Sequence, residues 1–150
     1  MKARDLMSTN LITVTKDTPL KEVADLMVKH RISGIPVVDG DRLLGIVTES
    51  DMLVRAKKLE LPTFLPFIGG IIYLEGPSRL NEEVKKMTAI KAEEIMTTKL
   101  HTITPDETLE TIATLMVEKK VNRLPVVEDG RLVGIITRSD VVRAVASELE

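Results

Sequence analysis

The chain has 150 residues, 43% of them hydrophobic, which is enough to form the buried core of one domain. Its 21 basic and 23 acidic residues nearly cancel, so the net charge offers little bulk electrostatic attraction to nucleic acid or to an anionic membrane. Cysteine is absent, which excludes disulfides and zinc–thiolate sites, and no segment has the roughly 18 apolar residues of a spanning helix, so we expect a cytoplasmic protein.

The first 57 residues predict the element order β-α-β-β-α. Residues 11–14 indicate a short extended stretch. Residues 17–19 indicate a helix start, because Asp17 or Thr18 can cap free amides and Pro19 suits an early helical position. The apolar residues that follow have the i, i+3, i+4, i+7, i+8 spacing of an amphipathic helix. They are Leu20, Val23, Ala24, Met27 and Val28.

Two apolar runs follow this helix, at residues 35–38 and 43–47, and a short polar turn at residues 39–41 separates them. Their β-branched residues and the turn predict a hairpin of two mostly buried strands. Thr48 then begins a second helix, whose inward face is predicted to hold Met52, Leu53 and Ala56.

Residues 58–91 are predicted to form an apolar insertion and a linker helix. All three aromatic residues of the chain, Phe64, Phe67 and Tyr73, lie between residues 61 and 74. Two prolines and two glycines argue against a single helix in this stretch, and it is too short to span a bilayer. It is either a loop packed onto its own domain or an exposed apolar patch that dimerises or docks onto a partner. Residues 78–90 predict a helix.

Residues 92–150 repeat the pattern of residues 1–57. A shift of 89 positions aligns residues 7–51 with residues 96–140 without a gap, and 21 of the 45 pairs are identical. The second copy is expected to begin its helix at Asp106 and Glu107 and to turn at residues 128–130. Because one copy alone would expose much apolar surface, we expect the copies to pack sheet against sheet about a pseudo-twofold axis that creates two related clefts.

The element order, the two G-h-h-T-x-S-D endings, the Pro-Val-Val strands and the duplication together resemble the cystathionine β-synthase (CBS) domain pair, or Bateman module. The resemblance covers nearly all of the chain outside residues 55–91. It implies an α/β (α+β) fold of tandem β-α-β-β-α repeats and a regulatory sensor rather than an enzyme. The implied ligand is AMP, ADP, ATP or S-adenosylmethionine, which would act as a regulatory ligand and not as a cofactor. The implied partners are a second copy of the chain and a separately encoded target protein.

The two T-x-S-D endings place Thr48 three residues before Asp51, and Thr137 three residues before Asp140. This spacing has a purely structural explanation, because threonine followed by an acid three residues later forms a capping box. A strand-to-helix junction also presents free backbone amides to an anion, and a carboxylate there can accept hydrogen bonds from two ribose hydroxyls. The resemblance implies that the two aspartates hold ribose. It implies further polar contacts from Thr48, Ser50, Thr137 and Ser139.

The resemblance also implies which segments hold the adenine. From the residues alone, the segment before each Pro-Val-Val strand is the start of a buried strand, with proline where a ladder donor is dispensable. The extended stretch before each first helix would form the other wall. We expect the ribose aspartate of one copy to face the adenine wall of the other. The wall residues are Thr13, Val14, Ile32, Ser33, Gly34, Ile35 and Pro36 in the first copy, and Thr102, Ile103, Val121, Asn122, Arg123, Leu124 and Pro125 in the second.

The copies differ at positions that matter for phosphate. Gly34 is replaced by Arg123, and Glu49 by Arg138. Arg123 lies in the adenine-wall segment, where the resemblance implies a phosphate-binding arginine or histidine, and a guanidinium can grip phosphate through two hydrogen bonds. We therefore expect the cleft lined by Arg123 to bind a charged nucleotide. The other cleft is expected to be weaker or to prefer a ligand with less phosphate.

No other motif supports catalysis or metal binding. His30 and His101 have no counterparts in the opposite copy, so we predict neither a metal site nor acid–base chemistry from them. The sequence holds neither a P-loop nor a G-x-G-x-x-G motif. Two alternatives stay open. One is a protein-interaction module with unoccupied clefts, and the more distant one is nucleic-acid binding, which would be steeply salt-dependent.

Overall fold

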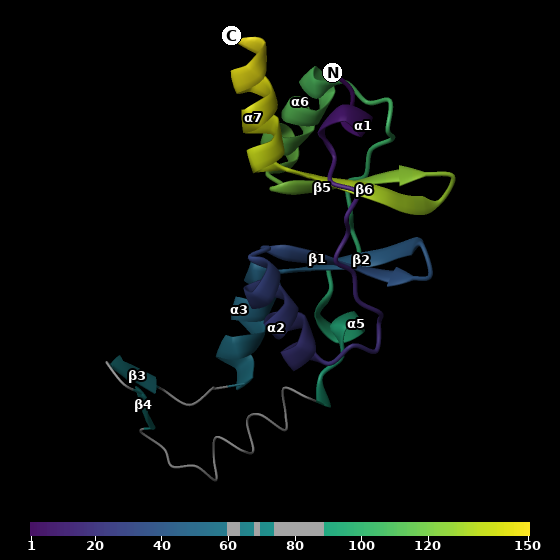
Figure 1. The fold of residues 1–150 in the computed structure, drawn as a ribbon. Coiled ribbons are helices and arrows are strands. Elements are labelled where there is room, and N and C mark those ends of the chain that lie inside the picture. The colour runs from purple at the N-terminus through teal and green to yellow at the C-terminus, as the bar shows by residue number, and fades with distance from the viewer. Residues whose placement is uncertain (60–63, 68–69, 74–88) are drawn as a thin grey trace. The chain divides into compact units, whose positions relative to one another are not determined.

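The computed structural model describes residues 1–59, 64–67, 70–73 and 89–150 (Figure 1). The chain divides into two compact units. The first-repeat unit comprises Thr13–Val38 and Leu44–Thr98. The second-repeat unit comprises Met1–Ile12, Asp39–Leu43 and Lys99–Glu150. Helices and strands are mixed, and each repeat supplies one two-stranded sheet.

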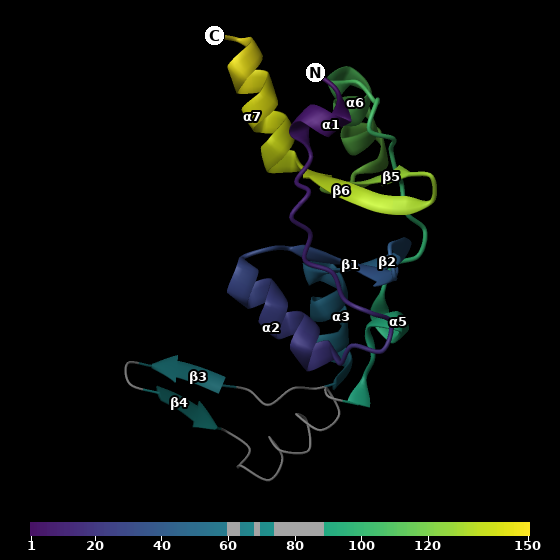
Figure 2. The same ribbon diagram turned by 45° about the vertical axis from the view of Figure 1, so that its right-hand side comes forward.

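The first repeat folds as a helix, a hairpin and a second helix. These elements are α2 (Leu20–His30), β1 (Gly34–Asp39), β2 (Arg42–Thr48) and α3 (Glu49–Leu59). Both helices lie on the same face of the hairpin (Figures 1 and 2). Val23 and Met27 of α2 are buried in one core with residues of the strands, and Met52 of α3 packs against it. The buried core comprises Val14, Val23, Met27, Ile35, Val37, Val47 and Ala92.

The second repeat has the same order. Its elements are α6 (Leu109–Lys119), β5 (Arg123–Glu128), β6 (Arg131–Thr137) and α7 (Arg138–Glu148). β5 and β6 pair antiparallel with Arg123 opposite Thr137, and the register shifts between Val126 and Val127. Asp129 and Gly130 both have positive φ, which fits a tight hairpin turn. The core comprises Ala3, Ile103, Ile112, Met116, Leu124, Val126 and Ile136.

Each compact unit includes a short helix from elsewhere in the sequence. The N-terminal helix α1 (Ala3–Leu6) belongs to the second-repeat unit, where the amide of Ala3 donates to the carbonyl of Glu107 at 2.7 Å. Helix α5 (Ala92–Ile95) belongs to the first-repeat unit, where the amide of Ala92 donates to the carbonyl of Thr18 at 2.9 Å. The leading segment of each repeat therefore completes the core formed by the other repeat.

The predicted helices and hairpins are confirmed, but Leu53, predicted to face inward, is 71% exposed, and Val28 of the predicted apolar stripe is 80% exposed, because both line the groove between α2 and α3 and not the core. The details at the start of each repeat are also wrong in two respects. Residues 11–14 form no strand. Val14 makes only a single parallel bridge to Val37. Neither Asp17 nor Thr18 caps α2, because Thr18 Oγ1 instead accepts from the amide of Thr15 at 3.0 Å and Pro19 occupies the N-cap.

The second copy shows the same pattern of differences. Ile103 bridges only Val126, in parallel. The N-cap of α6 is Thr108, whose hydroxyl accepts from the amide of Thr111 at 3.2 Å, and not the predicted Asp106 or Glu107. The prediction failed because a carboxylate near a helix start has other uses, and Asp106 pairs with the guanidinium of Arg4.

Within the insertion, β3 (Phe64–Phe67) and β4 (Gly70–Tyr73) form a third antiparallel hairpin with Phe64 opposite Tyr73. The prediction that this stretch is not a single helix is confirmed. The helix predicted over residues 78–90 lies outside the described residues except for its last two positions. Among the residues that the structure describes, no helix is both long and apolar enough to cross a membrane.

A glycine at the centre of each second strand permits a close contact between elements. A side-chain carbon at Gly45 would lie 2.8 Å from the carbonyl oxygen of Thr97, and one at Gly134 would overlap the side chain of Met7. The segment after α5 thus packs against β2, and the segment after α1 packs against β6. Both contacts lie three residues before the threonine that ends the strand.

Candidate functional site

The first T-x-S-D segment (residues 48–51) holds its aspartate at the junction of β2 and α3. Oδ2 of Asp51 accepts from the backbone amide of Thr48 at 2.8 Å and from its hydroxyl at 3.0 Å. The Thr48 hydroxyl in turn accepts from the amide of Asp51 at 3.3 Å. These three bonds form the predicted capping box, which fixes the carboxylate at the first turn of the helix.

The second T-x-S-D segment (residues 137–140) has the same geometry at the junction of β6 and α7. Oδ2 of Asp140 accepts from the amide of Thr137 at 2.8 Å and from its hydroxyl at 3.0 Å. The Asp140 side chain is only 14% exposed. In both segments one carboxylate oxygen is therefore committed to the cap, and the other oxygen is directed away from it.

The outer oxygens of the two aspartates have different partners. The hydroxyl of Thr97 lies 3.3 Å from Oδ1 of Asp51, so a neutral donor from the segment after α5 approaches the first aspartate. In the second segment, the guanidinium of Arg143 donates to Oδ1 of Asp140, and the two side chains form an ion pair. Neither residue was predicted from the sequence. Arg143 is detectable as an i, i+3 partner on one helix, whereas Thr97 is 46 positions from Asp51 and leaves no local signal.

The predicted adenine-wall segments lie next to the T-x-S-D segments of their own repeat. The amide of Glu49 donates to the carbonyl of Ser33 at 3.0 Å. The amide of Arg138 donates to the carbonyl of Asn122 at 3.0 Å, and its Nη1 lies 3.4 Å from Oδ1 of the same asparagine. Each helix that begins with a T-x-S-D segment is thus tied to the residue just before a strand. The predicted pairing of an aspartate with the wall of the other copy concerns the relation between the two units and stays a prediction.

The predicted wall residues differ in what they can offer a ligand. The exposed members can present polar atoms, and they are Thr13, Ser33, Thr102 and Asn122. Ile32, Gly34, Val121 and Arg123 are half-buried. The remaining members belong to the cores of their units, so they contribute backbone position and packing rather than an open side chain. They are Val14, Ile35, Pro36, Ile103, Leu124 and Pro125.

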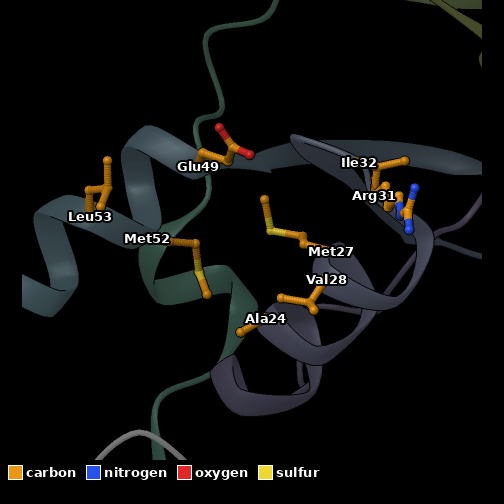
Figure 3. Close-up of a pocket in the computed structure, with 8 residues that line it drawn as sticks. All are labelled: Ala24, Met27, Val28, Arg31, Ile32, Glu49, Met52 and Leu53. Atoms are coloured by element: carbon orange, nitrogen blue, oxygen red, sulfur yellow. The ribbon is translucent and has the colours of Figure 1, made fainter. Parts of the chain in front are cut away.

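A separate apolar groove of about 520 Å³ lies between α2 and α3 (Figure 3). The side chains of Met27 and Met52 extend toward the space between the two helices, while the carboxylate of Glu49 points away from them. Ile32 is the one predicted ligand-binding residue among its lining residues. The lining residues are Ala24, Met27, Val28, Arg31, Ile32, Glu49, Met52 and Leu53.

The titratable groups form no further centre in the part of the chain that the structure describes. No group of three or more histidine, aspartate or glutamate side chains there could hold a metal ion. His30 and His101 are both exposed. The arrangement that stands out is therefore the pair of threonine-capped carboxylates.

Comparison with known proteins identifies this arrangement. The family model described as CBS domain matches residues 3–58 and again residues 92–147. The chain belongs to the CBS domain family. Each match contains one T-x-S-D segment, so the family repeats coincide with the internal duplication and the predicted resemblance is confirmed.

Several relatives have similar CBS repeats. An uncharacterized protein of Methanocaldococcus jannaschii, MJ1426, is 35% identical, and the match spans 96% of this chain and 90% of that protein. The chloroplastic CBS domain-containing protein CBSX2 of Arabidopsis thaliana is 30% identical over 90% of this chain and 58% of its own length. The inosine-5′-monophosphate dehydrogenase of M. jannaschii is 31% identical, but this chain spans only 23% of that enzyme.

Solved structures share the fold over nearly the full chain. The crystal structure of CBSX2 in complex with AMP has a TM-score of 0.75 and 28% identity, and it covers 99% of this chain and 98% of its own. The CBS domain pair of MJ0100 in complex with 5′-methylthioadenosine and S-adenosyl-L-methionine has a TM-score of 0.72 and 26% identity over the same shares of both chains. Adenosine-containing compounds are thus bound by CBS pairs of this size.

Proposed function

We propose that this CBS pair is a regulatory module that binds adenosine-containing ligands through its two T-x-S-D segments. The observation that carries the proposal is that Asp51 and Asp140 are each held by a threonine cap through one oxygen only. The AMP complex of CBSX2 and the adenosyl complex of MJ0100 support the ligand class. AMP, ADP, ATP and S-adenosylmethionine are the proposed candidates.

The chemistry of the junction suits a nucleoside. A ribose diol offers two hydroxyl donors, and an ionised carboxylate is an acceptor with lone pairs on both oxygens. The cap keeps each carboxylate in one orientation, so little side-chain entropy is lost when the ribose binds. Ser50 and Ser139 are exposed in the first turn of α3 and α7, where backbone amides and hydroxyls can meet a phosphate.

A ligand that binds Asp51 would act directly on the segment of chain that connects the two units. The hydroxyl of Thr97 competes with the ribose for the same carboxylate, and Thr97 also pairs with Ile46 through two backbone bonds of 2.8 and 3.0 Å. Thr97 lies one residue before the end of the first-repeat unit. A ligand that displaces its hydroxyl would favour one arrangement of that connection over another, and such differential affinity is how a sensor transmits a signal.

A thermal-shift panel tests the ligand class. AMP, ADP, ATP, S-adenosylmethionine and NAD would be added in turn, because a ligand that binds only the folded chain raises its melting temperature. We expect at least one adenosyl ligand to raise it, and mass spectrometry of the natively purified protein to detect the same class. Flat curves for all five would contradict the proposal and would favour a protein-interaction module.

We propose that the partner on the α2–α3 face is a second copy of the chain. Val28 is 80% exposed and its equivalent Val117 is 77% exposed, while Leu53 and its equivalent Val142 are 71% and 68% exposed. Neighbouring exposed positions diverged between the repeats, as Lys29 and Glu118 show. Two equivalent apolar faces on one chain match the self-complementary surfaces of a symmetric dimer. The α2–α3 groove would then be covered, and a separately encoded target would bind elsewhere.

A further inference from the structure

The two T-x-S-D segments differ in charge at equivalent positions beside their aspartates. Glu49 follows Thr48 in the first segment, and Arg138 follows Thr137 in the second. Gly34 in the first repeat is likewise replaced by Arg123. The change from Glu49 to Arg138 raises the net charge by two, and the change from Gly34 to Arg123 raises it by one. The net charge of the second repeat at these two positions is therefore three units more positive than that of the first.

The structure brings the exchanged positions together within each repeat. The backbone bond from Glu49 to Ser33 places Glu49 beside the residue that precedes Gly34. The matching bond from Arg138 to Asn122, together with the pairing of Arg123 opposite Thr137, places both arginines around the start of α7. Glu49 and Arg138 are both exposed, so each meets solvent and any ligand at its junction.

The neighbouring charges do not cancel this difference. Arg31 and Lys120, which end α2 and α6, are cationic in both repeats and leave the contrast unchanged. Arg143 lies beside Asp140 where the first repeat has Val54, but the first repeat has Arg55 where the second has Ala144, so these two exchanges balance in charge and leave the difference of three charges in place. The contrast between the two aspartate sites is therefore one of net charge as well as of individual residues.

We infer that the two repeats select adenosyl ligands of different charge, an inference that rests on the proposed function. The second T-x-S-D segment takes a phosphate-bearing adenine nucleotide. The first takes an uncharged or cationic adenosyl compound, such as a thioether or a sulfonium. The 5′ substituent of a nucleoside is attached to the same sugar whose hydroxyls donate hydrogen bonds to the aspartate, so it lies near the residue beside that aspartate. Glu49 therefore repels a 5′-phosphate, and Arg138 attracts one.

This division gives the protein two inputs. One site would report the level of phosphorylated adenosine compounds, and the other the level of adenosyl sulfur compounds. If the two sites bias the same conformational equilibrium, each ligand changes the affinity for the other by the same factor. The chain would then respond to the balance of the two ligand classes.

Calorimetric titration of single-site variants with AMP and with 5′-methylthioadenosine tests the inference. Asp140→Asn leaves the first site intact, and Asp51→Asn leaves the second. We expect the Asp51→Asn protein to prefer AMP and the Asp140→Asn protein to prefer 5′-methylthioadenosine. Adding Glu49→Arg to Asp140→Asn should shift that preference toward AMP by about tenfold, the effect of reversing one nearby charge in a largely aqueous setting.

The matched control is Glu22→Arg in the same Asp140→Asn background. Glu22 is exposed in the first turn of α2, the far end of that helix from Arg31, and it undergoes the same change of charge. We expect it to leave the preference unchanged, because screening limits the reach of an exposed charge to about 10 Å. Equal preferences at both sites, or equal shifts from both arginine variants, would overturn the charge inference while the proposed function stands. If neither compound binds the unmodified protein, the charge inference falls, and the five-ligand thermal-shift panel decides the proposed function.

Discussion

The guanidinium of Arg143 donates to Asp140, whereas the equivalent Asp51 is approached by the hydroxyl of Thr97. One aspartate thus has an ionic partner on its own helix, and the other has a neutral partner from a distant segment. The two sites have the same cap and different second partners. Because only the contact between Arg143 and Asp140 is an ion pair, its contribution to stability should depend on the salt concentration, whereas that of the contact between Thr97 and Asp51 should not.

Arg143→Val installs the residue found at the equivalent position 54. Because Arg143 is 72% exposed, we expect the variant to lower the free energy of unfolding by less than about 1 kcal/mol. The loss should shrink as salt rises, since the ion pair is screened. Urea denaturation at low and high salt measures this. Thr97→Val is the matched control, and its effect should not depend on salt. A loss in Arg143→Val that is unchanged at high salt would show that the ion pair is not its source.

The close contacts at the two strand glycines predict large effects from a small substitution. Gly45→Ala places a carbon 2.8 Å from the backbone oxygen of Thr97, which cannot rotate away. We expect a loss of about 1–3 kcal/mol in the free energy of unfolding. Gly40→Asn is the control, because nothing lies within 4 Å of a side-chain carbon there and asparagine tolerates the positive φ of 62°. Equal losses from both variants would contradict the packing explanation.

The ion pair between α1 and the start of the second repeat predicts a pH dependence. The hydrogen bond from Arg4 lowers the pKa of Asp106 below its ordinary value, with the charge of Arg4 as the next cause. A carboxylate with a lowered pKa stabilises the fold above its unfolded pKa, and that contribution is lost as pH falls through the folded value. Asp106→Asn should therefore destabilise the protein at neutral pH.

The difference between Asp106→Asn and the unmodified chain should shrink as pH falls below the ordinary aspartate pKa of about 3.9, and it should vanish below the lowered pKa of Asp106 in the fold. Denaturation at a series of pH values measures it. Asp25→Asn is a suitable comparison, because Asp25 pairs with Lys21 within one helix and joins no separate segments. A difference for Asp106→Asn that persists unchanged in acid would rule out the Arg4 contact as its cause.

The proposed dimer predicts that one substitution on the exposed face of α2 will lower the mass of the assembly in solution. Sedimentation equilibrium should give twice the chain mass of 16.6 kDa for the unmodified protein. Val28→Glu should shift it toward the monomer, because a charge would be buried without a partner in the interface. Lys29→Glu, at the adjacent exposed position, should leave the dimer intact. A monomeric unmodified protein, or a dimer untouched by Val28→Glu, would contradict this assignment of the face.

Local features of the fold were predictable from sequence, because they depend on short-range patterns. The spacing from Leu20 to Val28 predicted α2, and Thr48 with Asp51 predicted the capping box that the structure shows. The duplication also predicted that the second repeat would copy both. Such patterns express periodicity and hydrogen bonding within a few residues.

Contacts between distant segments could not be predicted in this way. The bond from Thr97 to Asp51 and the exchange of α1 and α5 between the repeats join residues far apart in the chain. The cap of α2 was wrongly predicted for a related reason, because the amide of Leu20 donates to the carbonyl of Ile90 and not to a local side chain. Tertiary contacts replaced the local cap.

The central claim is that two threonine-capped aspartates bind the ribose of an adenosyl ligand. Calorimetric titration of AMP into the unmodified chain and into the double variant Asp51→Asn, Asp140→Asn tests it most directly. Asparagine keeps one oxygen that can accept the hydrogen bonds of the cap, but it replaces the other carboxylate oxygen, which would accept from the ribose hydroxyls, with an NH2 group that only donates. The account predicts saturable binding to the unmodified chain and its loss in the folded double variant. Unchanged AMP affinity in the double variant would contradict it.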